Sequence, residues 1–152
     1  MQVRVATLGD VPAIIQIARQ FILEAPNYSN RELSEESLTK NLQAVINGSG
    51  AVVLAERQSK VVGGIVCLTS KDWFNDELIA FEQVFYVDPK FRSSRAPFLL
   101  LEAFIRWSKL MKANRIQCGT TTKINTKGCL RLYERFGFRE YGVVFDMELK
   151  HE

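Results

Sequence analysis

The chain has 152 residues, enough for one domain with a sizeable core, so it requires neither disulfides nor a structural metal. It carries 20 Lys and Arg against 17 Asp and Glu, and this net charge of +3 makes the position of the basic residues more informative than their number. The single histidine, His151, lies next to the C-terminus. A His-dependent metal site or a Ser-His-Asp triad is therefore excluded, and no metal is expected.

The cysteines are odd in number and each lies in an apolar pattern, which predicts free packing thiols in a reducing compartment. They are Cys67, Cys118 and Cys129. The sequence shows no signal peptide and no apolar run of about 18 residues. We therefore expect a cytoplasmic protein with no membrane contact.

The first third of the chain predicts a strand and two helices. Residues 3–6 form the strand, and Thr7 or Asp10 can cap the first helix. A second helix begins after Ser34 and ends at Gly48.

The middle of the chain predicts three strands. Residues 51–57 and 61–69 form a hairpin, in which Gly63 and Gly64 weaken the second strand or mark a bulge or a close backbone approach. Residues 78–87 are almost wholly apolar and predict a central strand.

The last third alternates between helices and strands. Helices are predicted over residues 97–112 and 127–136, and strands over residues 115–121 and 141–149. The order β-α-α-β-β-β-α-β-α-β predicts one α/β (α+β) domain over residues 1–152, with helices on the faces of a sheet.

The junction between the central strand and the next helix is the first functional motif. It reads V-D-P-K-F-R-S-S-R-A-P over residues 87–97 and opens directly into F-L-L-L. A helix N-terminus presents free N–H groups and the positive end of a dipole, which favours a phosphate. Basic residues flank this motif and the next one, and they indicate either a polyanion site or a solvated face. They are Lys90, Arg92, Arg95, Lys123 and Lys127.

The second motif is N-T-K-G-C-L-R-L-Y-E-R-F-G-F over residues 125–138. At this spacing the two motifs resemble those of the GNAT N-acetyltransferase family, and the resemblance covers nearly the whole chain. More narrowly, W-F at 73–74, R-S-S-R-A-P and G-T-T-T at 119–122 are similar to a small single-domain branch often encoded by bacteriophages. The resemblance implies a mixed central sheet of six to seven strands, about four helices, and acetyl-CoA as the cofactor.

The resemblance also implies which residues bind coenzyme A. Backbone amides of the loop grip its diphosphate with Arg92 alongside, the strand end pairs with pantetheine, and Asn125 holds pantetheine or caps its helix. Arg95 and Pro97 depart from the small residues usual in the family, and Pro97 lacks an N–H. The predicted cofactor-binding residues are Phe85, Tyr86, Val87, Arg92, Ser93, Ser94, Arg95, Ala96, Phe98 and Asn125.

Two residues are the catalytic candidates. Periodicity alone favours Tyr133 as a core residue, whereas its match to the family motif implies a general acid that protonates the leaving thiolate. Glu82 interrupts the apolar central strand. It either faces a cleft as a general base, or marks a bulge or an ion pair, and both readings stay open.

Trp73 and Phe74 lie in a polar loop before the central strand. They either form a wall of the acceptor pocket or cap the core, and the second reading is slightly favoured.

The resemblance thus implies acetyl transfer to a primary amine, carried by a small molecule or a protein, through direct attack in a ternary complex. A non-catalytic acyl-CoA-binding module with the same fold is the alternative. A nucleic-acid binder, suggested by the pI of 8.8, ranks well behind because interleaved exposed aromatics are absent. The acceptor and the oligomeric state stay open, with a homodimer among the options.

Overall fold

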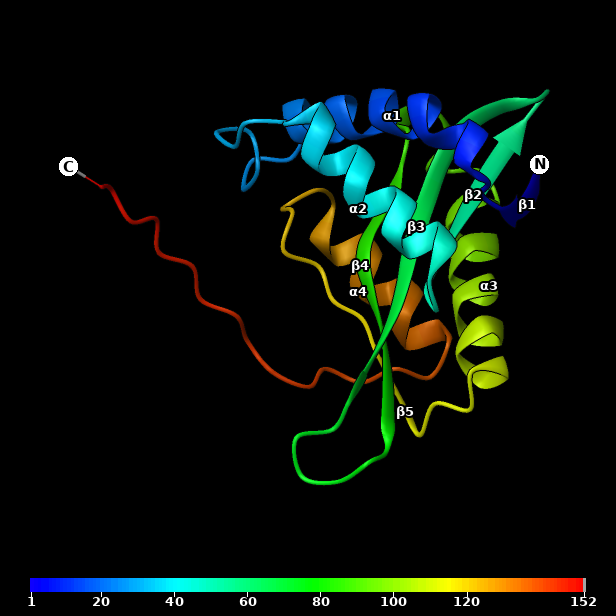
Figure 1. The fold of residues 1–152 in the computed structure, drawn as a ribbon, viewed down its shortest axis with the longest axis vertical. Helices are drawn as coiled ribbons and strands as arrows, with labels where there is room; N and C mark the ends of the chain where they lie inside the picture. The colour runs from blue at the N-terminus through cyan, green and yellow to red at the C-terminus, as the bar shows by residue number, and fades with distance from the viewer. Residues whose placement is uncertain (152) are drawn as a thin grey trace.

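The computed structural model describes residues 1–151, which form a twisted sheet covered by helices on both faces (Figure 1). The strands lie in the order β1-β2-β3-β4-β5. All neighbours are antiparallel except β4 and β5, which are parallel. The strands are β1 (Gln2–Val5), β2 (Ala51–Arg57), β3 (Lys60–Lys71), β4 (Leu78–Val87) and β5 (Arg115–Gln117).

The helices pack in two groups because the strands alternate their side chains between the two faces. On one face Val52 and Leu54 pack in a cluster with Val11 and Leu42. On the other face Val53 packs in a second cluster with the third helix and with Tyr133 of the fourth. The helices are α1 (Val11–Glu24), α2 (Glu35–Asn47), α3 (Ala96–Leu110) and α4 (Thr126–Arg135), with 3₁₀ turns η1 (Leu8–Asp10) and η2 (Pro89–Phe91). None of the helices described over residues 1–151 is long and apolar enough to cross a bilayer.

The predicted helix boundaries agree with the structure to within two residues. Ser34 caps α2, and its hydroxyl accepts from the N–H of Ser37 at 3.1 Å. At α1 the carboxylate of Asp10 caps no helix N–H but binds the guanidinium of Arg4, at 2.7 Å between Oδ1 and Nη2. This ion pair fastens the start of α1 to β1.

Two irregularities shape the sheet near β4. Gly63 approaches the β4 backbone so closely that a Cβ would lie 2.7 Å from the carbonyl oxygen of Tyr86, which explains the glycine. The register of β3 and β4 shifts where Val66 faces Val84 but Cys67 faces Glu82. Gln83 is thus an extra residue, and the bulge re-aims the neighbouring side chain of Glu82.

The parallel pairing of β4 with β5 is short, and this leaves a gap beside β4. β4 and β5 pair only where residues 79–81 face residues 115–117. Beyond Phe81 the two strands separate, so the edge of β4 that faces away from β3 has no partner strand within the described chain. A cleft lies in this gap.

The strand predicted over residues 141–149 is not formed, and the sheet has fewer strands than the expected six to seven. Residues 139–151 run outward from the body as an extended segment (Figure 1). The prediction of a strand is therefore wrong for the described chain, because a strand also needs a neighbouring edge to supply hydrogen bonds. The segment pairs with no such edge within the described residues.

Candidate active site

A cleft of about 960 Å³ opens where β4 and β5 separate. Its walls come from residues 82–87 of β4, the segment 119–122 that follows β5, and α4. The end of α1 and the loop after it close one side through Phe21 and Tyr28. The volume is that of a site for a cofactor-sized ligand.

Glu82 and Tyr133 both bind the backbone of one residue, Gly119, on the cleft wall. The carboxylate Oε1 of Glu82 accepts a hydrogen bond from the N–H of Gly119 at 2.9 Å. The hydroxyl of Tyr133 donates to the carbonyl oxygen of the same glycine at 2.8 Å. The two residues named from the sequence therefore lie on either side of Gly119.

The environment of Glu82 makes it a titratable base near neutral pH. Burial raises the pKa of Glu82 to about 7, although the hydrogen bond from the Gly119 N–H opposes the shift. The carboxylate is then partly ionised at neutral pH and can accept a proton. The bulge expected as one alternative is present at Gln83, and Glu82 also lines the cleft, while its role as a general base stays a prediction.

Tyr133 is buried and keeps its proton. Burial raises the pKa of its phenol, and the charge of Glu82 raises it further. The ring belongs to the core cluster on the α3 side and stacks edge-on against Phe138 with centroids 6.1 Å apart. The prediction that Tyr133 is a core residue is thus confirmed, and its hydroxyl also reaches the cleft wall, while its role as a general acid stays a prediction.

The loop before α3 presents backbone donors at the helix N-terminus. The hydroxyl of Ser94 accepts from the N–H of Ala96 at 3.2 Å and donates to the carbonyl of Phe91 at 2.5 Å. The N–H groups of Ser93 and Arg95 make no hydrogen bond to residues 1–151. Free donors at this position suit a phosphate group.

Arg92 forms its contacts with other residues of the protein. Its guanidinium binds both carboxylate oxygens of Glu24 at 2.5 Å and donates through Nε to the carbonyl of Val87 at 3.0 Å. The hydroxyl of Tyr86 donates to Glu24 at 2.6 Å. The hydrogen bonds from Arg92 lower the pKa of Glu24. This cluster ties the C-terminus of α1 to β4 and to the loop.

Asn125 caps α4 and also lines the cleft. It adopts a left-handed backbone with φ of 43°, and its side-chain oxygen accepts from the N–H of Gly128 at 3.2 Å. A Cβ on Gly128 would lie 2.4 Å from Nδ2 of Asn125, so the glycine makes room for the cap. The capping role predicted as one alternative is therefore confirmed.

The other predicted cofactor residues divide into two groups. Three of the ten predicted cofactor-binding residues, Ser93, Arg95 and Ala96, do not line the cleft. Those that line it are Phe85, Tyr86, Val87, Arg92, Ser94, Phe98 and Asn125.

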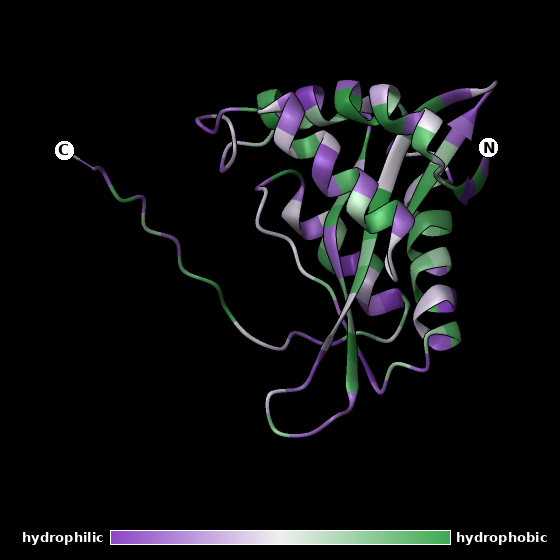
Figure 2. Ribbon diagram, in the orientation of Figure 1, coloured by the Kyte–Doolittle hydropathy of each residue, from purple (hydrophilic) through white to green (hydrophobic). Residues whose placement is uncertain are grey.

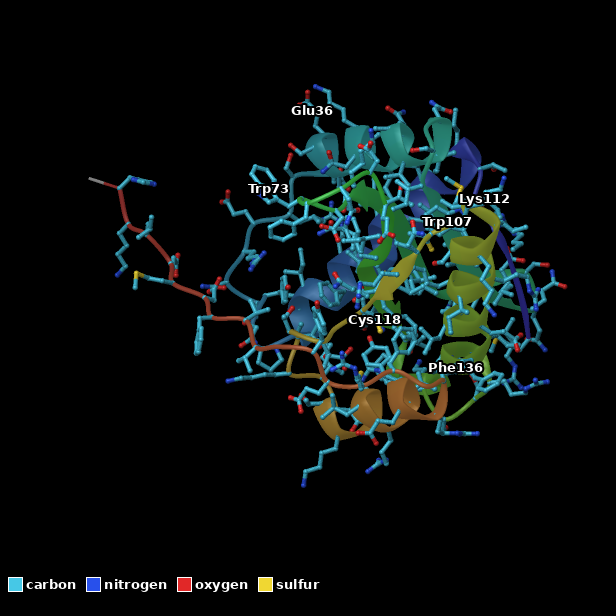
Figure 3. All side chains as sticks on the ribbon, turned by 90° about the horizontal axis from the view of Figure 1, so that it is seen from below. Glu36, Trp73, Trp107, Lys112, Cys118 and Phe136 are labelled. Carbon is cyan, nitrogen blue, oxygen red and sulfur yellow. The ribbon has the colours of Figure 1, made fainter. Side chains whose placement is uncertain are left out.

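Trp73 and Phe74 lie elsewhere. Their side chains are 92% and 88% exposed at the tip of the β3–β4 hairpin, and neither lines the cleft. Figure 3 shows Trp73 at the periphery, whereas Cys118 lies near the middle of the molecule. The structure thus gives them neither of the predicted roles, because the long hairpin carries its tip away from both the cleft and the core.

Several cleft residues were not identified from the sequence. The sequence points to Gly119 only as part of the G-T-T-T motif, because a residue that acts through its backbone atoms has no side chain that would indicate its role. Glu24 and Tyr28 approach the cleft from α1 and the loop after it, through contacts to Arg92 and to Thr121. Arginines also line the cleft, and their positive charge suits a polyanion. They are Arg31, Arg92, Arg131 and Arg135.

Comparison with known proteins agrees with this architecture. The profile of the acetyltransferase (GNAT) family matches residues 15–138. No curated protein matches the chain in sequence.

Solved structures resemble the whole chain at low sequence identity, and this likeness concerns the fold alone. AAC(6')-Iy in complex with a bisubstrate analogue of coenzyme A has a TM-score of 0.78 at 14% identity, covering 99% of this chain and 98% of that one. An aminoglycoside acetyltransferase from an uncultured soil metagenomic sample has a TM-score of 0.75 at 17% identity, covering 98% of both chains. A ribosomal-protein-alanine N-acetyltransferase from Brucella melitensis has a TM-score of 0.73 at 9% identity, covering 98% of this chain and all (100%) of that one.

The family profile spans most of the chain and includes the loop before α3, the splayed strands and the Tyr133 motif. The implied resemblance is therefore confirmed at the level of the family, while the bacteriophage branch stays a prediction. The chain belongs to the GNAT family of acetyltransferases.

Proposed function

We propose that this protein transfers an acetyl group from acetyl-CoA to a primary amine that binds in the same cleft. The observation that carries the proposal is the convergence of Glu82 and Tyr133 on the backbone of Gly119. It supports the proposal because a carboxyl group with a pKa of about 7 and a protonated phenol then bind the same residue of the cleft wall.

The residues present fit coenzyme A. The free N–H groups of Ser93 and Arg95 at the start of α3 suit its diphosphate, and the unpaired edge of β4 over Phe85–Val87 suits its amide-bearing pantetheine arm. Asn125 also lines the cleft. When bound, acetyl-CoA supplies the thioester that the amine attacks.

The base is needed because an alkyl amine is mostly protonated at neutral pH, with a lysine near 10.4. Glu82 accepts that proton, directly or through water, and its raised pKa brings its basicity close to the working pH. Tyr133 then donates its proton to the departing sulfur, since burial keeps the phenol neutral until that moment.

A covalent acyl-enzyme is disfavoured by the thiols near the cleft. Burial, followed by the charge of Glu82, raises the pKa of Cys118 to about 12. Burial likewise raises the pKa of Cys129. Neither is a thiolate at neutral pH, and the single histidine, His151, lies at the chain end. The amine therefore attacks directly in a ternary complex.

The acceptor class is a free amine on a small molecule or a protein. Two of the compared structures are aminoglycoside acetyltransferases and one is a ribosomal-protein-alanine N-acetyltransferase, so a test panel includes aminoglycosides, polyamines and peptides with free N-termini or lysines. Phe21 and Tyr28 supply flat apolar surface on the acceptor side of the cleft.

The alternative is an acyl-CoA-binding module without turnover. It is motivated by Pro97, which removes a backbone donor from the first turn of α3. Titration calorimetry with acetyl-CoA, combined with a thiol-release assay over the amine panel, separates the two. Binding together with amine-dependent thiol release supports the enzyme. Binding without release from any amine supports the module.

A further inference from the structure

The C-terminal segment, residues 139–151, is the largest unexplained feature of the molecule. Its alternate side chains are apolar, and each is 67 to 92% exposed. The positions between them are Gly142, Val144, Asp146 and Glu148, of which only Val144 has a large apolar side chain. This period of two is that of an amphipathic strand (Figure 2). The apolar side chains are Tyr141, Val143, Phe145, Met147 and Leu149.

The segment forms no strand pairing with its own chain over the described residues. It passes β5 where the guanidinium of Arg115 lies 5.7 Å from the ring centroid of Tyr141, and then diverges from the sheet. Beyond that point Asn30 donates to Glu148 at 3.3 Å, on the exposed surface. Residues 143–149 contain neither Gly nor Pro, so the sequence offers no turn that would reverse the segment into a hairpin.

The outer edge of β5, on the same molecule, is an unpaired strand edge with which an extended segment could pair. β5 is the last strand of the sheet and pairs only with β4, so its outer edge has no partner strand in residues 1–151. Open edges readily pair with another chain. The segment leaves the body beside this very strand, at Arg115. A two-fold axis near residues 139–141 would bring the segment of each copy to the β5 edge of the other.

We propose that two copies of this chain exchange their C-terminal segments, and that residues 141–149 of each copy pair with the outer edge of β5 in the other. Fully extended, residues 141–149 span about 30 Å, longer than β5 itself, so reach is not limiting. The arrangement is isologous and closed, and it removes both the exposed apolar face and the open edge in one step.

The area that such an exchange buries is sufficient for a stable dimer. Aromatic side chains bury about 150–250 Å² each, and aliphatic ones about 60–120 Å² each at the usual transfer coefficient. Two segments together then bury roughly 1,000–1,700 Å² before the covered partner surface is counted, against about 1,200–2,000 Å² for a standard interface. The docked face contains two aromatic rings, Tyr141 and Phe145, of the kind that anchors interfaces.

The exchange would also support the cleft, a consequence that rests on the proposed function. Gly119, whose N–H and carbonyl bind Glu82 and Tyr133, follows β5 by only two positions. A strand paired along the outer edge of β5 would hold this residue in place. We therefore expect the rate of turnover to depend on the dimer, whereas the reaction that is catalysed stays the same.

The test is the mass of the protein in solution, measured by sedimentation equilibrium without any substrate. Phe145→Asp places a charge on the docked face, and we expect the dissociation constant of the dimer to rise about 100-fold or more. Val144→Asp is the matched control, because Val144 is 76% exposed and points to the other face of the segment, and its dimer should persist. Neither change touches the core, so both variants fold.

A dimeric wild type, a monomeric Phe145→Asp variant and a dimeric Val144→Asp variant support the proposal. A monomeric wild type, or a Phe145→Asp variant that stays dimeric, overturns it. Hydrogen exchange tests the edge: amides of residues 115–117 and 143–149 should be protected in wild type and lose protection together in Phe145→Asp. Unprotected amides in wild type contradict the pairing. Since no substrate is present, the result stands whether or not any amine is acetylated.

Discussion

At the scale of single residues, the backbone of Gly119 decides what Glu82 and Tyr133 can do. Its N–H binds the carboxylate and its carbonyl binds the phenol, so the two side chains are held in fixed positions on one wall. Burial acts on both groups in the same direction, because it disfavours each charged form. The result is a carboxylate that can pick up a proton and a phenol that keeps one.

Tyr133→Phe tests the phenol. We expect kcat to fall about 10²- to 10⁴-fold, the usual contribution of a general acid, while acetyl-CoA affinity measured by calorimetry stays within error. Tyr141→Phe is the control, because it removes the same hydroxyl from an exposed position outside the cleft. Equal turnover of Tyr133→Phe and wild type would remove the phenol from the mechanism.

Glu82→Gln tests the role of Glu82 as a base through the pH dependence of kcat/KM. For wild type we expect kcat/KM to rise with pH through about 7 and then level off, because Glu82 must be ionised. The glutamine variant should be slower and lack this limb, retaining only the ionisation of the acceptor amine at higher pH. A limb near pH 7 that survives the substitution would assign it to another group.

The same carboxylate affects stability in a defined direction. The pKa of Glu82 in the folded state, about 7, lies above its ordinary value of 4.5, so the native protein binds the proton more tightly than the unfolded chain does. Its favourable contribution is complete below pH 4.5 and is lost as the pH rises through 7. Melting temperatures of Glu82→Gln relative to wild type should therefore increase between pH 5 and pH 8. A difference that does not change with pH would contradict the raised pKa.

At the scale of elements, the ion pair between Glu24 and Arg92 joins parts of the chain that are distant in sequence. It connects the end of α1 to the loop before α3, and Tyr86 of β4 adds a third hydrogen bond. The predicted place of Arg92 beside a diphosphate is untested, but its guanidinium is already engaged by Glu24 and Val87. We infer that Arg92 positions the loop whose amides bind the phosphate.

A double-mutant cycle tests this role. Glu24→Ala and Arg92→Ala should each lower the free energy of unfolding, and the double variant should lose little more than the worse single one, with a coupling of about 1–3 kcal/mol. We expect acetyl-CoA affinity to fall by the same factor in both single variants. Arg95→Ala is the control, since Arg95 is exposed and its stability effect should stay within about 0.5 kcal/mol. A much larger affinity loss in Arg92→Ala alone would indicate direct phosphate contact.

At the scale of the whole molecule, the exposed C-terminal segment makes stability depend on association. If two chains exchange the segment, the melting temperature of the full chain rises with protein concentration, because a dimer is favoured by mass action. A chain truncated after Gly142 should melt at a temperature independent of concentration, since it lacks the docked face. Differential scanning fluorimetry over a range of concentrations measures both. A full chain whose melting temperature does not move with concentration would contradict the exchange.

Apart from the last strand, which does not form, the order and type of the elements could be predicted from the sequence, as could the family. These features depend on local chemistry: the period of apolar residues, Ser34 as a cap, Pro97 in a first helical turn, and the motif around Tyr133. The predicted second strand of the hairpin is also confirmed, and Gly63 within it allows the close backbone approach to β4 that was predicted as one alternative.

The tertiary structure alone decided which groups meet. Glu82 finds Gly119, Arg92 finds Glu24, and Trp73 is carried away from the cleft, all through contacts between residues far apart in the chain. The C-terminal segment shows the same division most clearly. Its alternation fixes the strand-like character of residues 141–149, but whether a strand forms depends on a neighbouring edge, and no local pattern specifies where that edge lies or on which molecule.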